Sequence, residues 1–318
     1  MPTRTVHFSV DRPLGTLFTR SHNEETESGW KRLGHAYGSV TLPADASLRL
    51  KVAAEETAPT DLSALAMLRP NDLQSLRLEY TPTTDATLSS LEGLTGLWEL
   101  DVKATAVTDS GLRHLRDLAH LVELGLWETR VTNTGLTSLE GLTHIRKLDL
   151  GMTDVTCSGL KLLRHMSRLQ GLSLGRTRIG DLGLTFLGSL TRLEGLFLGG
   201  TRITGQGLAH LQNLHALRRI ALAATAVDDA GLGHLRRLPT LEWLYLGGTL
   251  ISDSGLAYLG EIPTLRWICL PGTSVTDTGL THLTRLTALE ELDLRDTRVS
   301  RAGIERLRQA LPNCLIMH

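Results

Sequence analysis

The sequence predicts an α/β solenoid built from stacked copies of one short repeat. A leucine or isoleucine recurs every 24 residues from Leu73 to Leu289. Each recurrence begins nearly the same pattern, L-x-x-L-x-L-x-x-T-x-V-T-D-x-G-L-x-x-L-x-x-L. The ten copies contain 70 apolar slots, and only Thr83 and Ala310 lack a larger aliphatic residue or methionine there. A fixed period of this kind is the signature of a repeat architecture.

Each repeat is expected to begin with a short strand. In the repeat from Leu97 to His120, Leu100 and Val102 alternate with Asp101. Alternation of period two places the apolar residues on one face and the intervening residues on the other. A Thr follows in every repeat, from Thr81 to Thr297, where its hydroxyl can satisfy backbone groups as the chain turns inward.

A helix is expected after this turn. Thr108 and its equivalents are predicted N-caps, with Gly180 as the tolerated exception. Asp109 then suits the positive end of the helix dipole. We interpret Gly111 as permitting close packing on the neighbouring repeat, because glycine is a poor helix former. Leucines at a spacing of three, Leu112, Leu115 and Leu118, predict the buried stripe of that helix.

These residues resemble the leucine-rich-repeat family, in its 24-residue form with Thr where many members carry Asn. The resemblance covers residues 73–312, and an irregular earlier copy is predicted from Leu48 to Asp72. It implies a right-handed, curved horseshoe with a parallel sheet on the concave face and helices on the convex face. The family does not imply one function.

Three regions are predicted along the chain. Residues 1–47 are expected to form a small β-rich N-terminal cap, from strand-like runs at Val6–Val10, Thr16–Thr19 and Ser39–Leu42. Residues 48–312 form the solenoid, and residues 313–318 form a C-terminal cap strand in which Ile316 takes the next strand slot. Caps are expected because stacked repeats need their ends covered.

The composition narrows the class of protein. The 318 residues are 41% apolar and 21% charged, with a net charge of −1 and a pI near 6.9, which disfavours nucleic acid as partner. No signal-peptide core or membrane span is evident. The cysteines at 157, 269 and 314 are odd in number and widely spaced, so a reducing, cytoplasmic setting is predicted.

The outward strand positions carry the expected binding site. They are charged in repeats two to four and in repeat ten, and nearly uncharged between. Exposed aromatics among small residues are typical of interface hot spots. The candidate partner-binding residues are Trp127, Phe197, Arg219, Trp243, Tyr245 and Trp267. Alternatively, the aromatics stack on one another, or the N-terminal region folds over part of this face.

Three other sequence features bear on function. Arg178 and Arg202 on one rim could bind an anion, although a solvated loop edge is the commoner meaning. Histidines at one helix slot, His210 and His234 among them, lack the converging ligands that a metal site needs. Gly171–Gly175 matches G-x-S-x-G, but Ser173 lies within a repeat strand rather than at the sharp turn of a nucleophile elbow. We therefore predict no enzyme, metal or cofactor.

The sequence predicts a protein-interaction module that holds a macromolecular partner on the aromatic patch, as a sensor, adaptor or regulatory subunit. Three alternatives remain open. The same aromatics could receive a small ligand or glycan, which would require a compact pocket with polar neighbours. The patch could bury itself in a homo-oligomer. An active site in residues 1–47 ranks last, because that segment lacks a convincing acid, base and nucleophile.

Overall fold

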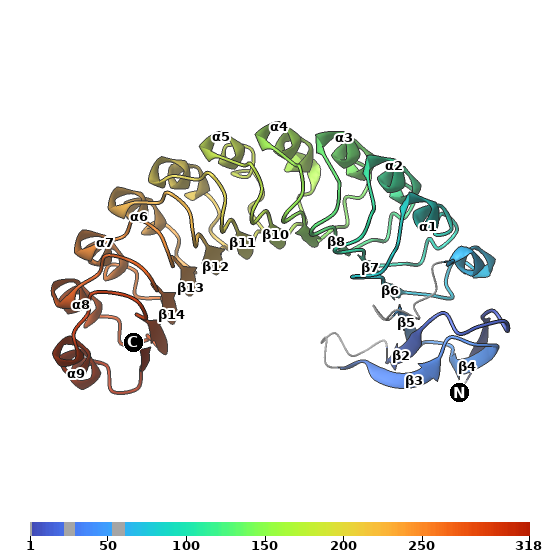
Figure 1. Ribbon diagram of the computed structural model, residues 1–318, viewed down its shortest axis with the longest axis horizontal. Coiled ribbons are helices and arrows are strands. Elements are labelled where there is room, and N and C mark those ends of the chain that lie inside the picture. The colour runs from blue at the N-terminus through green and yellow to red at the C-terminus, as the bar shows by residue number, and fades with distance from the viewer. Residues whose placement is uncertain (1, 22–28, 53–60) are drawn as a thin grey trace. The chain divides into compact units, whose positions relative to one another are not determined.

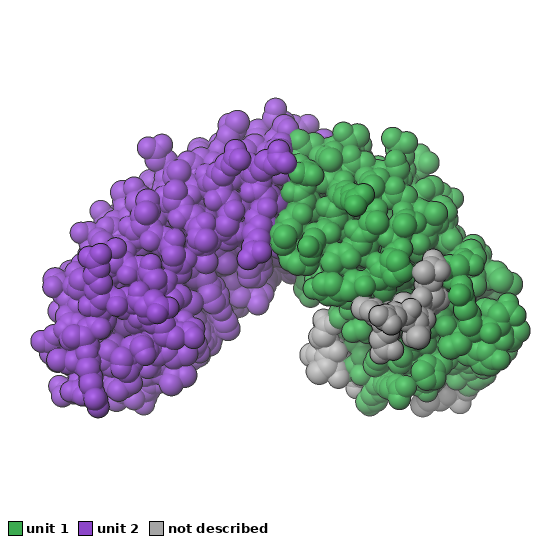
Figure 2. All heavy atoms as spheres, in the orientation of Figure 1, with its two compact units in different colours: residues 1–154 green, residues 155–318 purple. Residues whose placement is uncertain are grey.

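The computed structural model describes residues 2–21, 29–52 and 61–318. It divides into two compact units, residues 1–154 and residues 155–318, which are coloured separately in Figure 2. The boundary falls inside the repeat region. Each unit is described by itself below.

The first unit combines an antiparallel N-terminal region with parallel repeat strands. Its strands are β1 (Thr3–His7), β2 (Thr16–Arg20), β3 (Lys31–His35), β4 (Ser39–Pro43), β5 (Ser47–Lys51), β6 (Ser75–Arg77), β7 (Glu99–Asp101), β8 (Glu123–Gly125) and β9 (Lys147–Asp149). Strands β1 and β4 form a separate pair, while β3, β2 and β5 to β9 lie side by side in that order. From β5 onward each neighbour is parallel.

Two expectations for the N-terminal region need correction. The strand predicted at Val6–Val10 is wrong in its bounds, because β1 pairs Thr3–His7 with Ser39–Pro43. Strand β3 was not predicted at all. Its sequence KRLGH has no alternating apolar pattern, because it is an edge strand paired on one side only, with β2.

The second unit is a regular run of parallel strands. They are β10 (Gly171–Ser173), β11 (Gly195–Phe197), β12 (Arg219–Ala221), β13 (Trp243–Tyr245), β14 (Trp267–Cys269), β15 (Glu291–Asp293) and β16 (Leu315–Met317). They lie in chain order, and each pairs with the next in a constant register. The α/β fold with a parallel sheet, predicted from the repeats, is confirmed.

Helices and 3-10 helices cover one face of the repeat strands in both units (Figure 1). In the first unit they are η2 (Ser63–Met67), α1 (Asp85–Ser89), α2 (Asp109–Leu112), η3 (Arg113–Leu115), α3 (Asn133–Leu136) and η4 (Thr137–Leu139). In the second they are α4 (Cys157–Leu160), η5 (Lys161–His165), α5 (Asp181–Leu184), η6 (Gly205–Leu211), α6 (Asp229–Leu235), α7 (Asp253–Leu259), α8 (Asp277–Leu283) and α9 (Arg301–Ala310). The opposite face of the strands is called the open face below.

Many of these helices are shorter than predicted. Helix α2 ends at Leu112, and η3 continues through Leu115. Leucines spaced strictly three apart match the three residues per turn of a 3-10 helix better than the 3.6 of an α-helix. The predicted stripe is nevertheless buried, because Leu112, Leu115 and Leu118 have no exposed surface.

The Thr slot closes the strand turn within its own repeat. Thr249 donates its hydroxyl to the carbonyl of Leu246 at 2.5 Å, and Thr129 donates to that of Leu126 at 2.7 Å. Both hydroxyls are buried, so these bonds satisfy carbonyls that water cannot reach. Each Thr thereby stabilises the turn that ends its own strand.

The Asp that follows the helix cap joins neighbouring repeats. Asp109 accepts hydrogen bonds from both the backbone N–H and the hydroxyl of Thr132, each at 2.7 Å. The prediction that Asp109 interacts with the helix dipole therefore missed the main contacts of this carboxylate, which are with Thr132. The glycine interpretation is confirmed, because a Cβ on Gly135 would lie 2.4 Å from an Asp109 carboxylate oxygen. Asp, hydroxyl and Gly act together as one inter-repeat contact.

The residue before each Thr slot takes a left-handed backbone conformation. Gly200, Gly248 and Gly272 occupy this position in three repeats, with φ between 66° and 71°. In the other repeats non-glycine residues have positive φ there, for example Ala224 at 55°. The fold therefore holds this turn even where the side chain disfavours it.

Candidate functional site

The open face of the second unit carries two parallel rows of side chains. The register pairs Arg219, Trp243, Trp267 and Glu291 across β12 to β15 in the first row. It pairs Phe197, Ala221, Tyr245, Cys269, Asp293 and Met317 across β11 to β16 in the second row. Neighbouring members of a row are about 5 Å apart at their backbones, the ordinary strand spacing.

Three of the predicted site residues form one aromatic cluster. The ring centroids of Trp243 and Trp267 lie 4.0 Å apart with an interplanar angle of 30°, and Tyr245 lies 6.4 Å from Trp243. The Arg266 guanidinium lies 5.1 Å from the centroid of Trp267. All three rings remain half-buried. They therefore stack partly on one another, as the alternative interpretation expected, yet keep accessible surface.

A pocket of about 240 Å³ opens beside this cluster. Its lining consists of Trp243, Tyr245, Trp267, Ile268, Cys269, Glu291, Asp293, Arg295 and Met317. The sequence identified the outward positions of repeat ten only as charged. The sequence could not indicate a pocket, because its walls come from four strands of separate repeats.

The carboxylates of the pocket differ in their partners. Asp293 accepts two hydrogen bonds from the guanidinium of Arg295, at 2.9 and 2.6 Å, and its side chain is 4% exposed. Bonds from Arg295 hold the pKa of Asp293 below its ordinary value, although burial opposes this. Glu291 is half-buried and makes no side-chain hydrogen bond or ion pair with another described residue.

Burial raises the pKa of two ionisable groups in the pocket. Burial, followed by the nearby Asp293 carboxylate, raises the pKa of the Cys269 thiol to about 11. The thiol lies 3.6 Å from a carboxylate oxygen of Asp293 and donates to it. Burial also raises the pKa of Tyr245, with further contributions from Cys269 and Glu291.

Phe197 and Arg219 lie together at the other side of the cluster. A Cβ built on Gly195 would approach the Phe197 ring at 3.3 Å and the Arg219 Nε at 3.8 Å, so both side chains flank this glycine. Phe197 is 37% exposed, and Arg219 is exposed without a side-chain partner among the described residues. The intervening Ala221 separates Phe197 from Tyr245 in their row.

The remaining predicted residues do not join this cluster. Trp127 is half-buried and belongs to the first unit, two residues beyond β8. Arg178 and Arg202 are exposed in neighbouring repeats of the second unit, away from the pocket lining. The backbone of Arg202 bridges to Gly180, which places it at the turn before a helix. An anion site at these arginines stays a prediction.

In the first unit, the N-terminal region covers part of the open face. Trp30 stacks on Trp98 with ring centroids 6.3 Å apart, and the Arg49 guanidinium lies 4.2 Å from the Trp30 ring. Beneath them Glu99 is only 4% exposed and accepts bonds from Arg49 at 2.5 Å and Arg77 at 2.8 Å. Burial would raise the pKa of Glu99, but the two guanidiniums outweigh it and lower the pKa.

One alternative from the sequence was that the N-terminal region folds over part of the outward strand face. The structure shows such a contact at β5 to β7. From the sequence, Trp30 was not connected with Arg49 or Glu99. The repeat register could have indicated this contact. It aligns Arg49 on β5, Ser75 on β6 and Glu99 on β7 in one row. Ser75 links the pair, donating to Glu99 at 2.8 Å.

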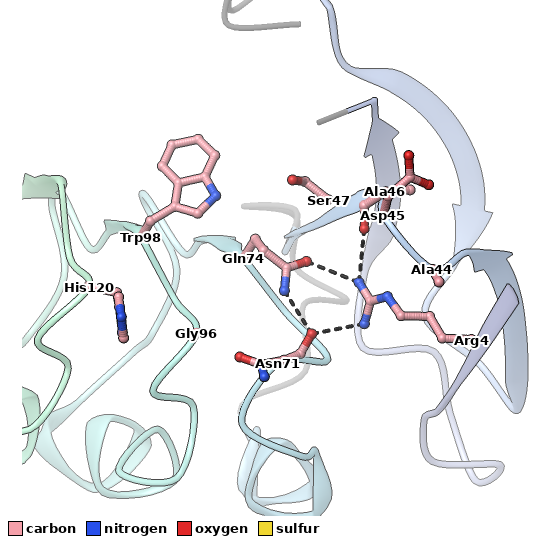
Figure 3. Close-up of a pocket in the computed structure, with 10 residues that line it drawn as sticks. All are labelled: Arg4, Ala44, Asp45, Ala46, Ser47, Asn71, Gln74, Gly96, Trp98 and His120. Carbon is pink, nitrogen blue, oxygen red and sulfur yellow. Dashed lines mark hydrogen bonds between the residues drawn. The ribbon is translucent and has the colours of Figure 1, made fainter. Parts of the chain in front are cut away.

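A larger pocket of about 600 Å³ lies near the N-terminal ends of the repeat strands in the first unit (Figure 3). Its most prominent group is Arg4, whose guanidinium donates to the carbonyls of Asn71 and Ala46 and to the side chain of Gln74. These bonds join β1 to the first repeats and leave few donors for a ligand. We therefore interpret this larger pocket as a structural junction.

The sequence features considered for catalysis and metal binding do not form a site among the described residues. Ser173 lies at the end of β10 between the buried Leu172 and Leu174, in extended backbone. Among residues 2–21, 29–52 and 61–318, no three His, Cys, Asp or Glu side chains gather as metal ligands. Within the same ranges no helix has the length and apolar character needed to cross a membrane.

Two solved structures share this architecture. An internalin from Listeria monocytogenes superposes with a TM-score of 0.58 at 22% identity, over 85% of this chain and 86% of that chain. A leucine-rich-repeat protein from Leptospira interrogans gives a TM-score of 0.54 at 17% identity, over 82% of this chain and 75% of that chain. No protein-family model and no curated protein matches the sequence. At these identities the likeness concerns the fold.

Proposed function

We propose that this chain, which has the leucine-rich-repeat fold, is a protein-interaction module that holds a macromolecular partner on the open face of β11 to β15. The observation that carries the proposal is the half-buried aromatic cluster of Trp243, Tyr245 and Trp267. Large rings with low rotational freedom are the residues that most often dominate binding energy at protein interfaces.

The surroundings of the cluster support this use. Glycines and alanines at Gly195, Ala221 and Gly247 leave room beside the rings for a partner's side chains. Arg219 lies on one side and Glu291 on the other, which gives an apolar centre with a charged rim. The proposal assigns recognition to this chain and leaves any enzymatic output to its partner.

A small ligand is the second candidate, because the structure has the two features that this alternative required. The pocket beside the rings is compact, and Glu291, Asp293 and Arg295 are polar neighbours. Its volume of about 240 Å³ is below the roughly 300–1,000 Å³ typical of small-molecule sites. This size suits one inserted side chain better than a free ligand, so the candidate ranks second.

The test is affinity capture from the organism that encodes the chain, using wild type and Trp243→Ala/Trp267→Ala. Tyr258→Ala is the matched control, because Tyr258 is a half-buried aromatic on α7, on the helix-covered side. Each variant is checked by circular dichroism and thermal unfolding. Solution mass is measured across concentrations to detect self-association.

A protein retained by wild type and by Tyr258→Ala, but lost by the double variant, supports the proposal. Capture that survives the double variant contradicts it. A concentration-dependent dimer that the double variant abolishes would replace the proposed partner with a second copy of this chain.

A further inference from the structure

The first row of the open face ends in two opposite charges. Arg219 precedes Trp243 and Glu291 follows Trp267, in a continuous parallel register. The two charged residues are three strands apart, so their backbones are separated by about 14 Å. The aromatic cluster therefore lies between a cation and an anion.

Glu291 differs from the other carboxylates near it. Asp293 is paired with Arg295, Glu290 with Arg266 and Glu242 with Arg218. Glu291 is half-buried in the pocket wall, with Trp267 on one side and Leu315 on the other. A partly desolvated carboxylate without a partner is costly unless something outside the chain neutralises it.

The side chains that line the pocket also favour a cation. Trp243 and Trp267 both line the pocket, and indole is the side chain that attracts cations most strongly. The Asp293–Arg295 pair is neutral as a unit, so Glu291 determines the net charge of the lining. The thiol of Cys269 remains protonated beside Asp293 and adds no charge.

We propose that this pocket receives an arginine side chain of the partner, with its guanidinium against the indoles and paired with Glu291. A planar guanidinium can stack on an aromatic ring and still donate two parallel hydrogen bonds to a carboxylate, which an ammonium group cannot do. The inference rests on the proposed function and specifies what the partner must present there.

The first experiment uses defined probes. The indole N–H signals of Trp243 and Trp267, assigned with Trp→Phe variants, are followed by NMR during titration with N-acetyl-arginine-N-methylamide. The citrulline analogue, equal in shape but neutral, is titrated in parallel. Arginine is expected to shift both signals saturably at millimolar concentration, with affinity about tenfold above that of citrulline.

The variant Glu291→Gln keeps the shape of the side chain and removes its charge. It is expected to reduce the arginine affinity about tenfold and to leave citrulline unaffected. Glu305→Gln on α9 makes the same change of net charge at an exposed site and should change neither. Equal binding of citrulline, unchanged arginine binding in Glu291→Gln, or no response of the two indoles would each overturn the inference.

The capture experiment separates this inference from the proposed function. A partner lost with Trp243→Ala/Trp267→Ala and weakened by Glu291→Gln supports both. A partner lost with the tryptophans but bound normally by Glu291→Gln leaves the proposed function standing and overturns the arginine contact. Capture independent of the tryptophans removes the premise, and the arginine contact falls with it.

Discussion

The carboxylate of Asp253 accepts two hydrogen bonds from Thr276, 23 positions later, at the start of the next helix. The backbone N–H donates at 2.7 Å and the hydroxyl at 2.6 Å. Gly279 leaves the space, because a Cβ there would lie 2.5 Å from the Asp253 carboxylate. The same contact recurs from Asp229 to Ser252 and from Asp277 to Ser300. It is a repeated polar link between neighbouring repeats.

The variant Asp253→Ala should lower the free energy of unfolding by about 1–2 kcal/mol, because two charge-assisted hydrogen bonds are lost. Urea unfolding followed by circular dichroism measures this change. Asp117→Ala is the control, since Asp117 is exposed and makes no side-chain bond with another described residue. Equal stability of the two variants would show that the inter-repeat link contributes nothing measurable.

The helix start at Cys157 lacks this link, and restoring it there should stabilise the chain. Cys157 occupies the Asp position and Gly180 the hydroxyl position, joined by an N–H to sulfur contact of 3.3 Å. Gly180 has φ −122°, and a Cβ there would meet only ordinary contacts, so threonine fits. We expect Cys157→Asp/Gly180→Thr to raise the free energy of unfolding by about 0.5–1.5 kcal/mol. The thermal midpoint of unfolding should rise accordingly. A double variant less stable than wild type would show that an Asp–Thr contact does not form between positions 157 and 180.

At the left-handed position before the Thr slot, Gly→Ala and Ala→Gly substitutions should change the free energy of unfolding in opposite directions. Gly248→Ala should cost about 1 kcal/mol, because φ is 66° there, while Ala224→Gly should gain about 0.5 kcal/mol at φ 55°. A Cβ on Gly248 meets nothing closer than 3.9 Å, so backbone strain alone is tested. Both are measured by urea unfolding, and changes of the same sign in the two variants would contradict the argument.

The buried carboxylate of Glu99 predicts a pH dependence. Its pKa is lower in the folded chain than its ordinary value of 4.5, so its stabilisation is complete above that pH and is lost as pH falls through the lowered pKa. Glu99→Gln should lower the free energy of unfolding by about 3 kcal/mol at pH 7, because the buried Arg49 guanidinium loses its carboxylate. The stability difference between wild type and variant should shrink between pH 5 and pH 2; a constant difference would rule out this linkage.

The environment of Cys269 predicts slow alkylation. In a Cys157→Ser/Cys314→Ser background, iodoacetamide at pH 8 should react with it far more slowly than with a free thiol, because its pKa is raised to about 11. Asp293→Asn removes the carboxylate that accepts from the thiol and should increase the rate. An unchanged rate would mean that burial alone controls the thiol.

The sequence by itself determined the repeat, its strand and turn positions, and the outward-facing side chains. Each follows from periodicity: a period of 24 with L-x-L alternation admits only one register, so Trp243 and Trp267 had to be neighbours. The close packing permitted by Gly135 and its equivalents was predicted because glycine is a poor helix former. The first strand was misplaced, and the helices were predicted too long, because local patterns specify ends poorly.

Tertiary structure decided where side chains from different repeats meet. The Asp253–Thr276 link, the pocket beside Glu291 and the pair of Arg49 with Glu99 each bring together residues of different repeats. Hydrogen bonds and burial between such residues depend on rotamers and on the close approach of backbones, which no single repeat encodes. The aromatic surface was therefore predictable, whereas its unpaired carboxylate emerged only from packing.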